Sequence, residues 1–209
     1  MKKGRTPERG VHTSLKSRVY TAEELNLIEQ HLIETQDPLL YPFILSARYG
    51  LRAGEACAVR WCDLDLGAGI LRVRGSMRIV PGGLRYGKPN TAAACADVPL
   101  HPEDVQLFQA LRKEREQAGT MQVGAADVPD TPADAAALDA DGFVCLDAAG
   151  NMFSPRVLTE RFRGAAGGLG LREGAWHDLR ASFGAQLTAT GADAATGADA
   201  ATAAAALRL

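Results

Sequence analysis

Four basic side chains in three separate motifs have the chemistry needed to bind a phosphate group. Arg52 stands in YGLRAGE, Lys88 in RYGKPNT, and His177 and Arg180 both stand in WHDLR. A guanidinium offers a planar fork of donors that matches phosphate oxygens. His177 and Arg180 are three residues apart, which on a helix puts their Cβ atoms on one face about 5–6 Å apart. Together these groups can stabilise a phosphodiester as it gains charge in a transition state.

Each of these residues also has an ordinary structural interpretation. Arg52 alone is typical of a surface cation beside Glu55, and a single histidine such as His177 is usually a hydrogen-bonded core residue. Lys88, in a loop with Gly and Pro, fits a solvated charge as well as a catalytic acid. The pairing of His177 with Arg180 favours a functional role for that motif.

The distribution of charge along the chain says more about the binding partner than the overall composition does. The chain has 209 residues, a net charge of -2 and a pI near 6.1, which allows one core of ordinary size. Residues 1–18 nevertheless carry six basic side chains against one acidic, and residues 48–88 carry eight against three. Residues 97–147 carry three basic against eleven acidic side chains. Two local basic segments are therefore compatible with nucleic acid.

Targeting and redox signals are weak. No apolar run reaches the roughly 18 residues of a membrane-spanning helix, and the N-terminal MKKGRTPERG lacks the apolar stretch of a signal peptide. We therefore expect a cytoplasmic protein that contacts no membrane. The four cysteines form no CxxC pair, so we expect reduced, mostly buried thiols and neither a structural metal nor a cofactor.

The elements that position the basic residues are mostly helices. Thr21 and Glu24 make a capping-box pattern ahead of an amphipathic run that Pro38 ends, which predicts the first helix. Further helices are predicted over 39–49, Gly54–Arg60, from Pro102 to near Gly119, from Ser154 onward and over His177–Thr190, as their caps and apolar spacing indicate.

A change to a two-residue period predicts strands in the middle of the chain. Leu71 and Val73 alternate with Arg72 and Arg74. With strands over Met77–Val80 and Ala96–Leu100, they would form a small antiparallel sheet, and the stretch holding Pro81, Gly82, Gly83 and Gly87 would be a loop. The fold class is thus mainly α with a small antiparallel β-sheet (α+β).

Domain organisation follows from composition. Residues 1–18 read as a basic flexible arm and 19–190 as one domain. Residues 124–141, rich in Ala, Asp and Pro, are expected to be a disordered insertion within that domain. Residues 191–209 contain GADAAT twice in succession and read as a low-complexity tail.

Over roughly residues 20–190 these motifs resemble the tyrosine recombinase (phage integrase) family. GLRAGEACAVRWCDLDLGAGILRVRGS is similar to the family's first arginine box and the following strand, and HDLRASFGAQL to its second box. The resemblance implies the catalytic-domain fold, duplex DNA and other recombinase protomers as partners, and DNA cleavage through a 3′-phosphotyrosine without metal or cofactor. It places the first arginine on Arg52, its acidic companion on Glu55, the histidine on His177 and the second arginine on Arg180. The general-acid lysine falls on Lys88, with Arg85 as a poorer substitute because guanidinium rarely releases a proton.

The tyrosines depart from the family pattern. The four tyrosines, at 20, 41, 49 and 86, all precede His177, whereas the family's nucleophile follows the second arginine. The family's later histidine box is also absent. We therefore expect a C-terminally incomplete catalytic domain that acts in DNA integration and recombination but cannot cleave in cis. Two alternatives remain open: a non-catalytic DNA-binding module that competes for recombination sites, and a metal-dependent phosphohydrolase built on His177 and Asp178.

Overall fold

The computed structural model describes four parts of the chain, namely residues 19–89, 95–119, 133–134 and 142–189. The expected basic arm over 1–18 and the tail over 191–209 lie outside these described residues, as does most of the 124–141 segment.

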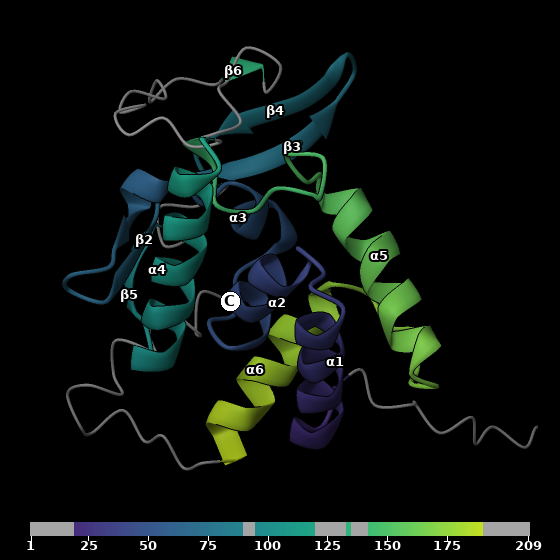
Figure 1. Cartoon of the computed structure of the whole chain (residues 1–209). Coiled ribbons are helices and arrows are strands. Elements are labelled where there is room, and N and C mark those ends of the chain that lie inside the picture. Colours follow the sequence, from purple (N-terminus) through teal and green to yellow (C-terminus); the bar gives the residue numbers. More distant parts are fainter. Residues whose placement is uncertain (1–18, 90–94, 120–132, 135–141, 190–209) are drawn as a thin grey trace, which may run out of the picture.

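The first two helices begin and end where local signals predict. Helix α1 covers Ala22–Glu34, with Thr21 and Glu24 forming the predicted reciprocal capping box. Its buried residues, Leu25, Ile28 and Leu32, lie on one face. Helix α2, Leu40–Ala47, is buried along almost its whole length. It lies at the centre of the molecule and packs against α1, α3 and α6 (Figure 1).

The remaining helices surround α2. They are α3 (Ala53–Cys57), the short 3₁₀ helix η1 (Trp61–Asp63), α4 (Pro102–Gln117), α5 (Pro155–Gly168) and α6 (His177–Ala189). The helix predicted over Gly54–Arg60 is thus shorter than expected. Ser154 caps α5 by accepting a hydrogen bond from the backbone N–H of Val157 at 3.2 Å, and Pro155 occupies the first turn.

The strands form two small antiparallel sheets instead of the single predicted sheet. One has the order β1–β2–β5 and the other β3–β4–β6. Their bounds are β1 (Leu64–Asp65), β2 (Ile70–Val73), β3 (Ser76–Val80), β4 (Gly83–Gly87), β5 (Ala96–Pro99) and β6 (Ala133–Asp134).

One sequence prediction is corrected here. The stretch expected to be a loop contains β4, which pairs with β3 across a turn at Pro81 and Gly82, where a positive φ at Gly82 allows the tight reversal. The stretch was read as a loop because its composition is rich in Gly and Pro, although β4 pairs with the strand that immediately precedes it. Within the 124–141 segment, for which a disordered insertion stays a prediction, Ala133 and Asp134 form β6 and pair with β4.

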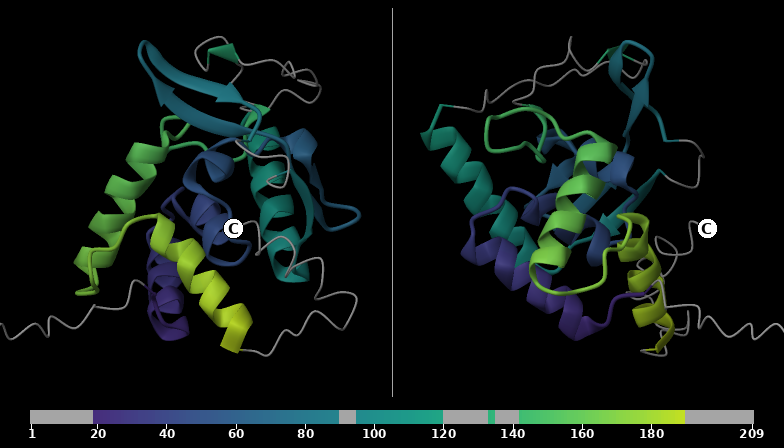
Figure 2. Two further views of the ribbon diagram at one scale, coloured as in Figure 1. Left: turned by 180° about the vertical axis from the view of Figure 1, so that it is seen from behind. Right: turned by 90° about the vertical axis from the view of Figure 1, so that its right-hand side faces the viewer.

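The views in Figure 2 show the β3–β4 hairpin extending from one end of the molecule, with the start of α5 close to it. The core below it is one cluster that includes Phe43, Phe108 and Phe162 of the helices and Leu71 and Val98 of the first sheet. Cys57 and Cys145 are buried in this core, whereas Cys62 and Cys95 are exposed, and these four described cysteines form no disulfide. Among the described residues, no helix has both the length and the apolar composition required to cross a membrane.

Candidate phosphate-binding site

Arg52 stands at the start of α3 and is fixed there by Glu55. The Glu55 carboxylate accepts one hydrogen bond from the Arg52 backbone N–H at 3.0 Å and another from its guanidinium at 2.9 Å. Glu55 is buried, whereas the Arg52 side chain stays 40% exposed. A buried carboxylate thus holds a solvent-accessible guanidinium in one orientation, as a preorganised anion site requires.

The first turns of α6 carry the other two predicted residues. His177 is exposed at the beginning of the helix, and Arg180 is buried one turn later. The Arg180 guanidinium donates a hydrogen bond to the carbonyl of Gly50, two residues before Arg52. The indole N–H of Trp176 donates to the hydroxyl of Ser46 at 2.9 Å. Both contacts fasten the start of α6 to the end of α2 and the turn that leads into Arg52.

A second network anchors α6 from the side of the N-terminal helix. The Asp178 carboxylate accepts from the backbone N–H of Ala175 and from the Arg172 guanidinium, both at 3.0 Å. The hydroxyl of Ser182 accepts from the backbone N–H of Tyr20 at 2.7 Å. Asp178 therefore orients the turn that bears His177, and its carboxylate is already engaged in this structural role.

Arg52 and His177 line one cleft of about 500 Å³. Its walls come from the start of α3, from β3, from the first turns of α5 and from the start of α6, and they include Gly54, Arg78 and Thr159. α5 and α6 both present their N-terminal ends here, where the helix dipole favours negative charge. The arrangement brings Arg52, Arg78, an imidazole and two positive helix ends to one opening, which suits an anion.

Gly54 allows α3 and β3 to approach closely enough to form this cleft. A Cβ atom at position 54 would lie 2.5 Å from the carbonyl oxygen of Met77 and 2.7 Å from the hydroxyl of Ser76. Both are atoms of β3, and the first belongs to the backbone, so no side-chain rotation relieves the contact. The glycine in GLRAGE thus sets the spacing between Arg52 and the β3–β4 hairpin.

Lys88 does not line the Arg52–His177 cleft. It is exposed at the end of β4 and lines a neighbouring pocket of about 530 Å³ with Arg78, Arg85 and Tyr86. Its backbone carbonyl accepts a hydrogen bond from the Arg78 guanidinium. Arg78 belongs to both pockets, and sequence reasoning missed it. The feature that could have identified Arg78 is the register of the β3–β4 hairpin, which places it opposite Arg85. This register cannot be assigned while residues 81–87 are interpreted as a loop.

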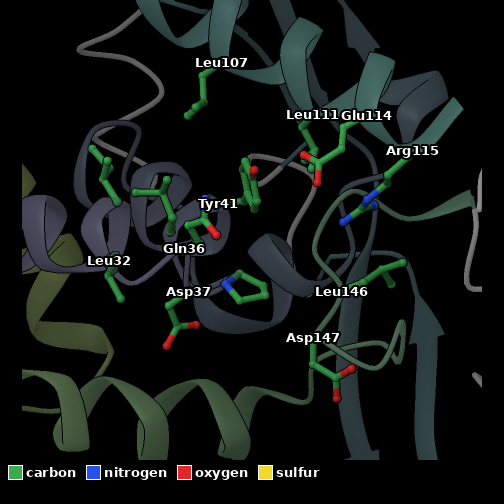
Figure 3. Close-up of a pocket in the computed structure, with 13 residues that line it drawn as sticks. Leu32, Gln36, Asp37, Tyr41, Leu107, Leu111, Glu114, Arg115, Leu146 and Asp147 are labelled. Carbon is green, nitrogen blue, oxygen red and sulfur yellow. The ribbon is translucent and has the colours of Figure 1, made fainter. Parts of the chain in front are cut away.

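A third pocket, of about 510 Å³, has a different character. It lies where the α1–α2 turn faces α4 (Figure 3), and the leucines in its wall are accompanied by Asp37, Glu114, Arg115 and Asp147. Asp37 is paired with Arg161 at 2.8 Å. Its charged residues are mainly acidic, so this pocket does not suit a phosphate. Within the described residues, no group of three or more His, Cys, Asp or Glu side chains is placed to hold a metal ion.

None of the four tyrosines lines the described Arg52–His177 cleft. Tyr20 donates to the carbonyl of Arg172 at 2.8 Å, and Tyr49 donates to the carboxylate of Asp104. Burial and the Asp104 contact raise the pKa of Tyr49, which disfavours the phenolate. Tyr86 lines the Lys88 pocket, where its ring lies under the Arg60 guanidinium.

Solved structures with a similar fold are recombinases and integrases. XerA recombinase aligns with 88% of this chain at 16% identity and a TM-score of 0.59, and this covers 54% of the XerA chain. The Tn1549 transposon integrase, in complex with transposon right end DNA, aligns with 94% at 17% identity and a TM-score of 0.63, covering 60% of that chain. A lambda integrase dimer bound to a COC′ core site aligns with 90% at 16% identity and a TM-score of 0.55, covering 57% of that chain.

This chain therefore spans between half and three-fifths of the length of these structural relatives. A comparison with curated proteins found no match. The sequence itself matches the profile of the phage integrase family over residues 18–200, which include the whole fold described above. The chain therefore belongs to the phage integrase family, the tyrosine recombinases.

Proposed function

We propose that this chain is the catalytic domain of a site-specific recombinase or integrase, which binds duplex DNA and acts in DNA integration and recombination in the cytoplasm. The observation that carries the proposal is the convergence of Arg52 and His177 in one cleft, with Arg180 joined to the same turn through the Gly50 carbonyl. DNA complexes of the Tn1549 and lambda integrases support the choice of duplex DNA as partner.

In this proposal the scissile phosphate lies in the Arg52–His177 cleft. Arg52 and His177 contact its non-bridging oxygens, and Arg180 contributes positive charge from the buried side. Lys88 protonates the departing 5′-oxygen. Because Lys88 now lines the neighbouring pocket, this role requires the end of β4 to approach the cleft when DNA binds.

The proposed DNA contact can be tested by the salt dependence of binding. Removing one phosphate contact reduces the slope of log K against log salt concentration by about 0.9. We expect Arg52→Gln to reduce the slope for a labelled duplex by about that amount, measured by fluorescence anisotropy. Arg112→Gln is the matched control, because Arg112 of α4 does not line the described cleft, and its 40% exposed side chain pairs with Glu116 at 3.0 Å. Equal slopes for wild type and Arg52→Gln would refute the phosphate contact.

We further propose that these 209 residues do not cleave DNA in cis. Cleavage needs a phenol at the scissile phosphate. The proposal is supported by the lining of the described cleft, which includes no tyrosine, and by the hydroxyls of Tyr20 and Tyr49, which donate to the Arg172 carbonyl and the Asp104 carboxylate. Incubation with nicked suicide duplexes should give no denaturation-resistant protein–DNA adduct. An adduct mapped by peptide analysis to one of the four tyrosines would overturn this proposal.

The position of the tyrosines also favours a second candidate, a non-catalytic module that occupies recombination sites. A mixture of this chain with an active recombinase of the family separates the two candidates. If the chain forms a working site with a neighbouring protomer's tyrosine, it will restore cleavage to a partner that lacks the arginine equivalent to Arg52. A purely competitive module will lower cleavage in proportion to the sites it occupies.

A further inference from the structure

Tyr49 joins the turn over residues 48–52, here called the Arg52 turn, to the first turn of α4. Its hydroxyl donates a hydrogen bond to the carboxylate of Asp104 and accepts one from the backbone N–H of His101 at 2.9 Å. The rings of Tyr49 and His101 also pack together, with their centroids 5.7 Å apart. Tyr49 and Asp104 are each only 1% exposed. A buried polar contact of this kind specifies one arrangement of the two segments that it joins.

Arg48, the preceding residue, fixes the same turn to α1 as well as to α4. Its guanidinium pairs with Glu29 of α1 at 2.6 Å and with Asp104 at 2.5 Å. The Asp104 carboxylate therefore accepts from both Arg48 and Tyr49, which offsets the cost of burying its charge. The end of α2 is thus tied by side chains to two other helices.

The Arg52 turn leads from these contacts directly into the phosphate site. Arg52 follows Tyr49 by three residues, and its backbone N–H is held by Glu55 at 3.0 Å. Among the residues that line the described cleft, none belongs to α4. Figure 1 shows α4 on the side of α2 opposite α5, whose first turn does line the cleft. The contacts of α4 therefore reach the described site through the Arg52 turn.

We propose that Tyr49 is a positioning residue for the phosphate site: its hydrogen bond to Asp104 holds the Arg52 turn so that Arg52 meets the phosphate in the correct orientation. The inference rests on the proposed function, because it concerns the same site. A binding site needs its side chains held to within about 0.5 Å by supporting hydrogen bonds. Tyr49 supplies such a bond from a buried position and acts on the phosphate only through Arg52.

A double-mutant cycle of duplex binding tests whether Tyr49 acts through Arg52. Tyr49→Phe removes only the hydroxyl and should weaken duplex binding by about fivefold, the factor that corresponds to one net hydrogen bond. In an Arg52→Gln background the same substitution should weaken binding by less than about twofold, because the contact that Tyr49 supports is already absent. Fluorescence anisotropy at one salt concentration measures all four affinities. Equal weakening in both backgrounds, or none in either, overturns the proposal.

Tyr41→Phe is the matched control for loss of a phenolic hydroxyl. Tyr41 stands in α2 but lines the third pocket, and its ring centroid lies 6.3 Å from that of Phe108. Its loss of a hydroxyl should leave duplex affinity unchanged. Urea unfolding gives the folded fraction of each variant, and the affinities are corrected for it. If Tyr41→Phe weakens binding as much as Tyr49→Phe does, the effect is not specific to the Asp104 bond and the proposal fails.

Hydrogen–deuterium exchange followed by NMR gives a second measurement that does not depend on DNA. Relative to Tyr41→Phe, Tyr49→Phe should speed exchange of the Arg52 amide by a larger factor than exchange of the buried amides of α5, because the Arg52 turn loosens locally. A factor at least as large in α5 would indicate a purely structural role and overturn the proposal. If the wild-type protein shows no salt-dependent duplex binding, the proposed function fails instead, and the exchange comparison still decides whether Tyr49 positions the Arg52 turn.

Discussion

At the scale of single residues, the site depends on how closely the backbone at Gly50 approaches α6. Gly50 has φ of +65°, and a Cβ there would lie 2.6 Å from the ring of Phe183. The carbonyl of the same residue accepts the hydrogen bond from Arg180. Gly50 thus leaves room for the Phe183 ring of α6 and provides the acceptor that orients the buried Arg180.

Gly50→Ala should lower the free energy of unfolding by about 2–4 kcal/mol. About half of this is the cost of a left-handed residue with a Cβ, and the rest is the contact with Phe183. Gly150→Ala is the matched control: it has φ of +81° but nothing within 4 Å of the added carbon, so it should lose only about 1–2 kcal/mol. Urea unfolding measures both, and equal losses would show that the Phe183 contact carries no penalty.

The sequence predicted the site residues unevenly for a physical reason. His177 and Arg180 share one helix, so their proximity follows from a spacing of three residues. Their approach to Arg52 depends on the packing of α6 against α2, which no local pattern encodes, and it was inferred only by resemblance. The position of Arg78 depends on the register of the β3–β4 hairpin, which could not be assigned while β4 was interpreted as a loop.

At the scale of elements, caps explain why the helices were predicted well. Thr21 and Ser154 each cap a helix through their own side chains. The starts of α1 and α5 can therefore be predicted from a few neighbouring residues. Strand β3 was predicted, but β4 was missed because glycine and proline are as frequent in this strand and its turn as they are in loops. Pairing partners, not composition, decide whether such a stretch is extended.

Ser154→Ala should destabilise the protein by about 1 kcal/mol, since the first turn of α5 loses the acceptor for the Val157 N–H. Thr159→Ala, on the same helix, is the control: its hydroxyl donates to the Pro155 carbonyl at 3.1 Å within the helix, a contact that contributes little. Thermal unfolding followed by circular dichroism measures both variants. A larger loss for Thr159→Ala than for Ser154→Ala would contradict the assignment of Ser154 as the important cap.

At the scale of the whole molecule, the core buries groups that must stay protonated. Burial raises the pKa of Cys145 to about 12 and raises the pKa of Cys57 as well. Burial and then the Asp104 carboxylate raise the pKa of Tyr49. All three groups keep their protons in the folded state at a pH where an unfolded chain would release them, so folding binds protons in alkaline solution.

Stability should therefore be constant up to about pH 9 and decrease above it. The contribution of each raised group is fully present below its unfolded pKa, near 9 for thiols and 10 for phenols, and is lost as the pH rises toward the folded value. Each group costs about 1.4 kcal/mol per pH unit in that interval. Urea midpoints between pH 8 and pH 11 measure the loss, and a midpoint that does not change with pH would refute it. Tyr49→Phe should start less stable and show a shallower alkaline decline.

The unequal burial of the four thiols has a practical consequence. Cys57 and Cys145 are enclosed in the core, while Cys62, in η1, and Cys95, just before β5, are open to solvent. Maleimide dyes will attach to the latter pair in the native chain without any engineered cysteine. They stand next to β1 and β5, the two edge strands of the first sheet, so energy transfer between donor and acceptor fluorophores can report a change in the separation of these edges as a duplex arrives.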